Sequence, residues 1–164
     1  MPHATFPTPL GTCAIAWNDT GLTRFLLPDP ARPAGGGTEA DPPPWVREII
    51  GRIERHVAGD PQDFSDARYD FTRVPEFNRA VLRATLAVKS GHTATYGELA
   101  AAIGQPPAAS RAVGAALGAN PWPLLIPCHR IVAASGKMTG FSGPGGVATK
   151  TRLLALEGAL LLSD

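Results

Sequence analysis

The strongest constraint on the fold is a pair of short helices joined by a tight turn. Thr95, followed three residues later by Glu98, forms a capping box, a pattern that begins a helix, here expected over 96–103. The residues Gly-Gln-Pro-Pro at 104–107 turn the chain, and 108–117 is predicted as a second helix. This arrangement is a helix-turn-helix. An ordinary helical hairpin without a role in nucleic-acid binding is the alternative for the pattern alone.

The second predicted helix carries almost no long side chains. Its stretch ASRAVGAALG holds one long polar residue, Arg111, among small ones that include Ser110, Ala112 and Gly114. A helix that reads base edges in the major groove usually carries several Arg, Asn or Gln residues. Small residues instead let the backbone approach a narrow or distorted groove, with Arg111 as the single inserted side chain. Tight packing between helices would explain the small residues as well.

The segment 124–132, LLIPCHRIV, is the candidate reactive site. Its apolar run predicts a short buried strand, broken by Pro127, which presents Cys128 at a bend. An imidazole beside a thiol, here His129, favours the thiolate, which is the nucleophilic form. The alternative is a cysteine buried in the core, because free cysteine packs as a small hydrophobic residue.

A carboxylate in the last predicted helix suggests a partner for this histidine. The helix, near 147–161, places leucines on one face with Glu157 among them. An unpaired buried charge is costly, so Glu157 needs a partner. His129 is the first candidate, with Arg130 and Arg152 as alternatives. Cys128, His129 and Glu157 would then form a relay of nucleophile, base and orienting carboxylate.

The first 72 residues predict a small α/β scaffold. Two β-prone runs, 12–17 and 22–27, flank a hairpin turn, and apolar spacing predicts a helix over 45–57. We expect 64–71 to return as a strand, and His3 and His56 to lie on the surface. The predicted fold is therefore an α/β N-terminal domain, residues 1–72, and a mainly α C-terminal domain, residues 73–164, with the helix-turn-helix.

Charge is divided unevenly along the chain. Residues 1–66 carry five Lys and Arg against nine Asp and Glu, whereas residues 67–164 carry ten against five. The basic half holds the Cys-His pair, which suggests a polyanionic partner there. Two cysteines and four scattered histidines give no metal-ligand spacing. With neither a signal peptide nor a membrane-spanning run, we expect a cytoplasmic protein without a metal or a membrane partner.

Four motifs resemble one known family. YGELAAAIG, RAVGAALGANP, IPCHRIV and LLALEG, in this order within residues 69–164, closely resemble the O6-alkylguanine–DNA alkyltransferases. The Pro-Cys-His-Arg core is the most specific of these. The opening hairpin also resembles the variable N-terminal domain of that family. The resemblance implies double-stranded DNA carrying O6-alkylguanine as the partner, a monomer, and no cofactor, because the protein itself accepts the alkyl group.

The resemblance also implies roles for individual residues. Cys128 would attack the alkyl carbon, His129 would act as the base through a water, and Glu157 would hold the imidazole. Tyr96 would donate a proton to the base ring and turn the target phosphate. The remaining implied residues are Arg111, which would fill the stack left by the flipped nucleotide, Asn120, which would brace the turn beside the site, and Pro123, Ile131, Phe141, Ser142 and Lys150 around the guanine pocket.

Two other functions stay open beside alkyl transfer. A non-catalytic lesion-binding protein of the alkyltransferase-like kind would share most of the motifs, but such relatives lack the reactive cysteine, which is present here as Cys128. A Cys-His hydrolase would leave Arg111 and Tyr96 unexplained. The sequence does not decide whether O4-alkylthymine or larger alkyl groups are substrates.

Overall fold

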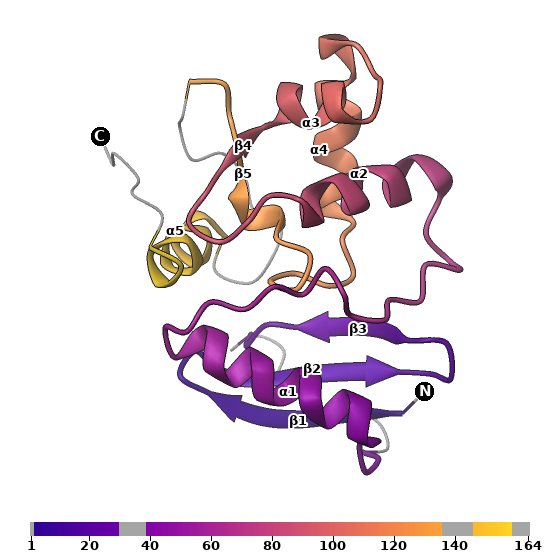
Figure 1. Cartoon of the computed structure of the whole chain (residues 1–164), viewed down its shortest axis with the longest axis vertical. Helices are drawn as coiled ribbons and strands as arrows, with labels where there is room; N and C mark the ends of the chain where they lie inside the picture. Colours follow the sequence, from indigo (N-terminus) through magenta and orange to yellow (C-terminus); the bar gives the residue numbers. More distant parts are fainter. Residues whose placement is uncertain (1, 30–38, 136–145, 159–164) are drawn as a thin grey trace.

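The computed structural model describes residues 2–29, 39–135 and 146–158 (Figure 1). The N-terminal half is a three-stranded antiparallel sheet in the order β1-β2-β3, with α1 lying across it (Figure 1). Its elements are β1 (His3–Thr8), β2 (Gly11–Trp17), β3 (Leu22–Leu26) and α1 (Pro44–Val57). The predicted hairpin and helix are confirmed.

The first strand of the sheet, β1, was not predicted from the sequence. β1 pairs along its whole length with β2, and Pro7 stands opposite Thr12. A proline has no N–H to donate to a ladder, so it weakens a sequence-based strand prediction, yet an edge strand tolerates it. β1 occupies the edge of the sheet, where the missing N–H of Pro7 is tolerated.

The predicted strand over 64–71 is wrong. This segment makes a single bridge, between Tyr69 and Leu22. Its side chains bond to its own backbone instead: Asp63 accepts from the N–H of Ser65, and Asp70 accepts from the N–H of Thr72. Such local bonds compete with a sheet ladder, so the segment follows the sheet as irregular chain.

The C-terminal half is mainly helical, with one very short parallel sheet (Figure 1). Its elements are α2 (Glu76–Leu86), β4 (Ala94–Thr95), α3 (Tyr96–Ala102), η1 (Pro107–Ala109), α4 (Ser110–Gly118), η2 (Cys128–Arg130), β5 (Ile131–Val132) and α5 (Gly146–Leu156). The capping box is present: Thr95 Oγ1 accepts from the N–H of Glu98, and the Glu98 carboxylate accepts from the N–H of Thr95. The helix-turn-helix is therefore α3, η1 and α4.

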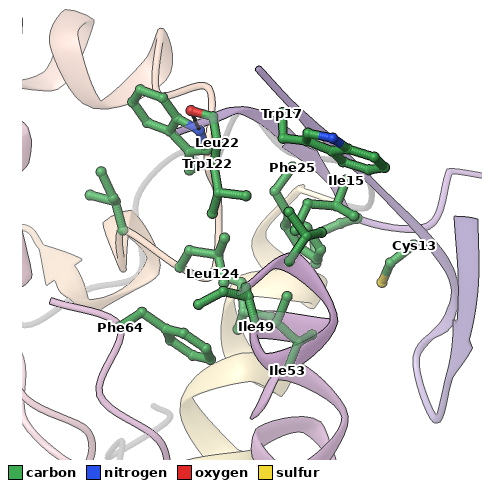
Figure 2. Packing of buried hydrophobic residues seen from close by; sticks show 14 of the residues in the cluster. Cys13, Ile15, Trp17, Leu22, Phe25, Ile49, Ile53, Phe64, Trp122 and Leu124 are labelled. Carbon is green, nitrogen blue, oxygen red and sulfur yellow. Dashed lines mark hydrogen bonds between the residues drawn. The ribbon is translucent and has the colours of Figure 1, made fainter. Parts of the chain in front are cut away.

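Two hydrophobic clusters hold the structure together. The smaller one joins α2, α3 and α4. The larger one joins the sheet and α1 to the turn before Cys128, with Trp122 and Leu124 packed near Phe25 and Ile49 (Figure 2). Trp122 also donates its indole N–H to the carbonyl of Leu22 at 3.1 Å. Because this core crosses residues 72 and 73, the domain boundary placed there stays a prediction.

The described helices also bear on the membrane question. None of those within residues 2–29, 39–135 and 146–158 is long and apolar enough to span a bilayer. The last helix, α5, buries Leu153 and Leu154 as predicted. Its predicted continuation, with Leu160 and Leu161, lies outside the described residues.

Candidate active site and nucleic-acid interface

The chain reaches Cys128 through two consecutive tight turns. Leu124 has a positive φ of 76°, and the N–H of Ile126 donates to the carbonyl of Trp122. Pro127, at φ −81° and ψ 65°, is the centre of an inverse γ-turn in which the N–H of Cys128 donates to the carbonyl of Ile126. The strand predicted before Pro127 is therefore wrong. The apolar residues there are buried because the turns insert them into the larger core, and only Ile131–Val132 forms a strand.

Asn120 fastens these turns with both ends of its amide. Its Oδ1 accepts from the N–H of Trp122 at 2.9 Å, and its Nδ2 donates to the carbonyl of Ile126, also at 2.9 Å. The two bonds tie the beginning of the loop to the residue two positions before Cys128. The amide also stabilises the Cys128 thiolate through a side-chain hydrogen bond, which acts to lower the thiol pKa.

The Cys128 thiol is subject to opposing influences. Burial is the largest and raises its pKa above the usual value. Asn120, the positive charge of Lys150 and the backbone N–H groups of Cys128 and His129 act in the opposite direction. Cys128 is half-buried and makes no disulfide. The site therefore keeps the resting thiol protonated while it supplies several groups that would stabilise the thiolate during a reaction.

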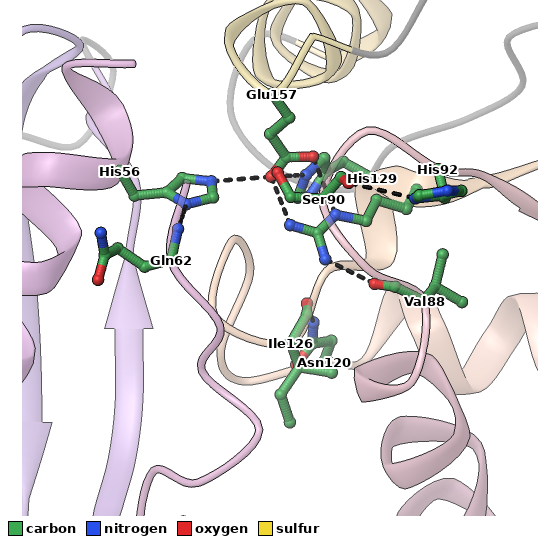
Figure 3. A network of polar contacts seen from close by, with 10 residues as sticks. His56, Gln62, Val88, Ser90, His92, Asn120, Ile126, His129 and Glu157 are labelled. Carbon is green, nitrogen blue, oxygen red and sulfur yellow. Dashed lines mark hydrogen bonds and ion pairs between the residues drawn. The ribbon is translucent and has the colours of Figure 1, made fainter. Parts of the chain in front are cut away.

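Glu157 is the centre of a buried polar network (Figure 3). Its Oε2 accepts from Nε2 of His129 at 2.9 Å and from Arg130 at 2.7 Å, and its Oε1 accepts from Nε of Arg130 at 2.9 Å. Burial would raise the pKa of Glu157, but these hydrogen bonds and one from His56 outweigh it and hold the pKa well below its usual range. The expected partner, His129, is thus present, together with one of the two alternatives, Arg130. Arg152 is exposed and donates to the carbonyl of Pro9 instead.

The interpretation of His56 as a surface residue is wrong. His56 is only 2% exposed, and its Nε2 lies 2.8 Å from Oε2 of Glu157 (Figure 3). Its position in the apolar pattern of α1, three residues after Ile53, was the signal for burial. Its partner is 101 residues away, which no local pattern identifies.

His129 is fully buried, and its two ring nitrogens differ. Nε2 bonds to Glu157, whereas Nδ1 has no hydrogen-bond partner among the described residues. Burial lowers the pKa of His129, although Glu157 acts in the opposite direction. The ring is therefore neutral at physiological pH, with its hydrogen on Nε2 and a free electron pair on Nδ1. A neutral imidazole in this state is a general base.

The expected pocket residues are only partly within the described ranges. Lys150 is buried, and its Nζ donates to the carbonyl of Ile131 at 2.6 Å. Ile131 is fully buried and Pro123 is half-buried. Phe141 and Ser142 lie outside the described residues. Within the described ranges, no three His, Cys, Asp or Glu side chains are grouped so that they could hold a metal ion.

The helix α4 presents small side chains to solvent. Arg111 and Ala112 are exposed, whereas Val113, Ala116 and Leu117 face the core. Arg111 makes no ion pair with any residue in the part of the chain that the structure describes. Ser110 donates to the carbonyl of Pro107, which ties the start of α4 to η1.

Tyr96, at the start of α3, packs against α4 at Gly114. A Cβ atom at position 114 would lie 3.8 Å from the Tyr96 ring, which is ordinary van der Waals contact. The phenol ring therefore lies against α4 at this position. Tyr96 and Arg111 thus lie on the same helix-turn-helix. The chain that follows α4 leads to Cys128.

A helix-turn-helix with an exposed arginine, in the same half as a half-buried thiol and a buried His-Glu pair, is typical of the class of nucleic-acid-binding proteins that carry a reactive cysteine. Comparisons with known proteins specify the class further. The family model for the 6-O-methylguanine DNA methyltransferase DNA-binding domain matches residues 76–159. A methylated-DNA–protein-cysteine methyltransferase of Mycolicibacterium paratuberculosis is 40% identical over 161 residues, which cover 96% of this chain and 92% of the relative.

Solved structures agree with the sequence comparisons. The crystal structure of Mycobacterium tuberculosis OGT in complex with DNA matches with a TM-score of 0.81 at 33% identity, covering 96% of this chain and 93% of that one. A methylated-DNA–protein-cysteine methyltransferase of Methanothermobacter thermautotrophicus is 34% identical, covering 93% and 83% of the two chains. The chain belongs to the 6-O-methylguanine DNA methyltransferase family. It is a DNA-binding methyltransferase of DNA repair.

Proposed function

We propose that this protein repairs O6-alkylguanine in duplex DNA by moving the alkyl group irreversibly to Cys128, once per molecule. The observation that carries the proposal is the state of His129. Its Nε2 is held by Glu157, and its Nδ1 is buried without a partner among the described residues, beside Cys128 in sequence. This is the arrangement that a base needs to take a proton from a neighbouring thiol.

In the proposed reaction, a sulfur–carbon bond forms as the carbon–O6 bond breaks. The thiol proton passes to Nδ1 of His129, by way of a water, and the electron pair of the broken bond stays on the guanine. Tyr96 gives a proton to the base ring, so that guanine leaves as a neutral molecule. The thioether on Cys128 has no leaving group that water could displace, so each molecule reacts once.

Binding to DNA would give Cys128 access to the alkylated guanine, which is stacked inside the duplex. We infer that α4 enters the minor groove with its small residues Ser110, Ala112 and Gly114, and that Arg111 occupies the space of the flipped nucleotide. The exposure of Arg111 and its lack of an ion pair among the described residues support this role. Pro123, Ile131 and Lys150, together with Phe141 and Ser142, would surround the flipped guanine.

Mass spectrometry of the intact protein and its peptides tests the proposal. After incubation with duplex DNA that contains O6-methylguanine, we expect one methyl group on the peptide with Cys128 and an equal loss of the lesion. Tight binding of the lesion without a change in mass would contradict alkyl transfer and indicate a damage-recognition protein. Release of a hydrolysed product over many turnovers would indicate a hydrolase.

A further inference from the structure

We propose that His56, in the N-terminal half, is a positioning residue for the alkyl-transfer site and fixes the carboxylate of Glu157 so that Glu157 can orient His129. The inference rests on the proposed function and adds to it a residue from outside the segment that carries the family motifs. His56 lies 101 residues before Glu157 in the sequence and belongs to α1. The remaining members of the network come from η2 and from the end of α5.

The hydrogen bonds of His56 identify which ring nitrogen donates and which accepts. Its Nδ1 accepts from the backbone N–H of Gln62 at 2.9 Å. Because Nδ1 is used as an acceptor, Nε2 carries the hydrogen and donates it to Oε2 of Glu157 at 2.8 Å. A backbone amide cannot rotate away or lose its hydrogen, so the tautomer of His56 is set by the path of the main chain after α1.

Packing holds the ring of His56 in this orientation. The centroid of the ring lies 5.6 Å from that of Phe64, and the two rings are tilted by 59°. The guanidinium of Arg52 lies over the same Phe64 ring, 5.2 Å from its centroid. His56 is 2% exposed. A buried side chain with both nitrogens bonded and one face against an aromatic ring has very little freedom, which is what a positioning residue requires.

His56 supplies a contact that the other donors do not. His129 and Arg130 are neighbours in η2, so their bonds to Glu157 come from one short segment. Those bonds alone would let the carboxylate shift together with that segment. Figure 3 shows His56 and His129 approaching Glu157 from opposite sides. With Oε2 bonded from both sides, the carboxylate is fixed relative to α1 and the larger core.

The charges around Glu157 predict what removal of His56 would do. The groups that face the carboxylate are His56 from α1 and His129 and Arg130 from η2. Without the bond from His56, the negative charge on Glu157 is less well satisfied and interacts more strongly with His129. The pKa of His129 then rises. His129 is then protonated, and lost as a base, at a higher pH. The acid limb of the pH–rate profile therefore moves to higher pH.

The experiment compares three variants of the full-length protein. His56→Phe keeps a ring against Phe64 but removes both nitrogens, His56→Gln keeps an N–H donor, and Val57→Ala is a matched control that removes buried volume from the same helix. Single-turnover methyl transfer is measured from pH 5 to 9, alongside the affinity for duplex carrying the lesion. We expect methyl transfer by His56→Phe to be slowed by about tenfold at neutral pH. The acid limb of its pH–rate profile should move to higher pH, and its DNA affinity should be retained.

Two comparisons decide between positioning and a merely structural role. If His56 positions Glu157, His56→Gln recovers most of the rate, and Val57→Ala transfers at the wild-type rate over the whole pH range. An unchanged rate in folded His56→Phe would overturn the proposal. An equal slowing at every pH, without recovery in His56→Gln, would overturn it as well.

A second readout separates this proposal from the proposed function. Nuclear magnetic resonance of the His129 ring, without DNA, follows its protonation in wild type and in His56→Phe. We expect the midpoint of protonation to be higher in the variant, and an unmoved midpoint would overturn the role of His56. If wild type places no methyl group on Cys128, alkyl transfer is wrong, and the ring titration still decides whether His56 acts on His129 through Glu157.

Discussion

Burial raises the pKa of both cysteines of this chain, but the two thiols differ in the groups that lie around the sulfur. Cys13, on β2, is fully buried, and burial raises its pKa to about 11, with only Thr8 acting against the shift. Cys128 is also subject to burial, but Asn120, Lys150 and two backbone N–H groups are arranged to favour its thiolate. Burial alone makes a thiol inert, and a reactive thiol needs donors placed around the sulfur.

Replacing Cys128, the proposed nucleophile, gives the largest expected effect. Cys128→Ala should abolish methyl transfer, because the other described thiol, Cys13, is fully buried and has only Thr8 to favour its thiolate. Cys13→Ala should transfer at the wild-type rate and lose about 1 kcal/mol of stability from the small cavity. Both are measured as lesion loss in a single turnover and as the midpoint of denaturation. Methylation of Cys13 in Cys128→Ala would break the contrast between the two sites.

The pH dependence of stability tests the network behind Cys128. Glu157 has a lowered pKa in the folded protein, so its contribution is complete above the unfolded pKa, about 4.5, and is lost as the pH falls through the folded value. Glu157→Gln leaves the buried Arg130 without its charged partner and should cost about 3 kcal/mol at pH 7. The difference in the free energy of unfolding between Glu157→Gln and wild type should narrow below about pH 4.5. Urea denaturation at several pH values measures it, and a gap that widens in acid would contradict the assignment.

The same substitution should slow the reaction at Cys128. In folded Glu157→Gln, His129 loses the carboxylate that orients it, and general-base catalysis is worth about 100-fold or more. DNA affinity should stay nearly intact, because Glu157 is buried away from α4. Single-turnover kinetics with Glu54→Gln, an exposed carboxylate on α1, provide the control. Unchanged kinetics would count against the relay.

Arg111→Ala should separate access to the base from chemistry at the sulfur. We expect repair in duplex DNA to fall by about tenfold, the loss of one anchoring contact worth about 1.4 kcal/mol, while reaction with free O6-benzylguanine changes little. The exposed Arg55→Ala removes the same charge from α1 and should affect neither substrate. Equal loss on both substrates would refute the proposed role of Arg111.

Local signals in the sequence predicted most of the elements. The capping box at Thr95 and Glu98 and the apolar spacing of α1 need only neighbouring residues, and the structure has these helices within a few residues of the predicted bounds. The buried position of Glu157 and its two partners in η2 also followed from a local argument, since a carboxylate in an apolar stripe requires partners.

What the sequence did not predict depends on contacts between distant residues. β1 exists because it pairs with β2, although Pro7 weakens the local pattern. The turns before Cys128 replace a strand because the core takes in Trp122 and Leu124. The hydrogen-bond partner of His56, Glu157, lies just after another helix, so the pattern of His56 in α1 indicates burial but not the reason for it.

The anchoring of the turn before Cys128 has a consequence for shortened versions of this protein. A chain cut to residues 76–159, the segment that the family model matches, would keep Trp122, Leu124 and Ile126 but lose the sheet and α1 that cover them. It would carry an exposed, aggregation-prone apolar surface directly beside Cys128. The segment that the family model matches is therefore shorter than the smallest part of the chain that could be used on its own.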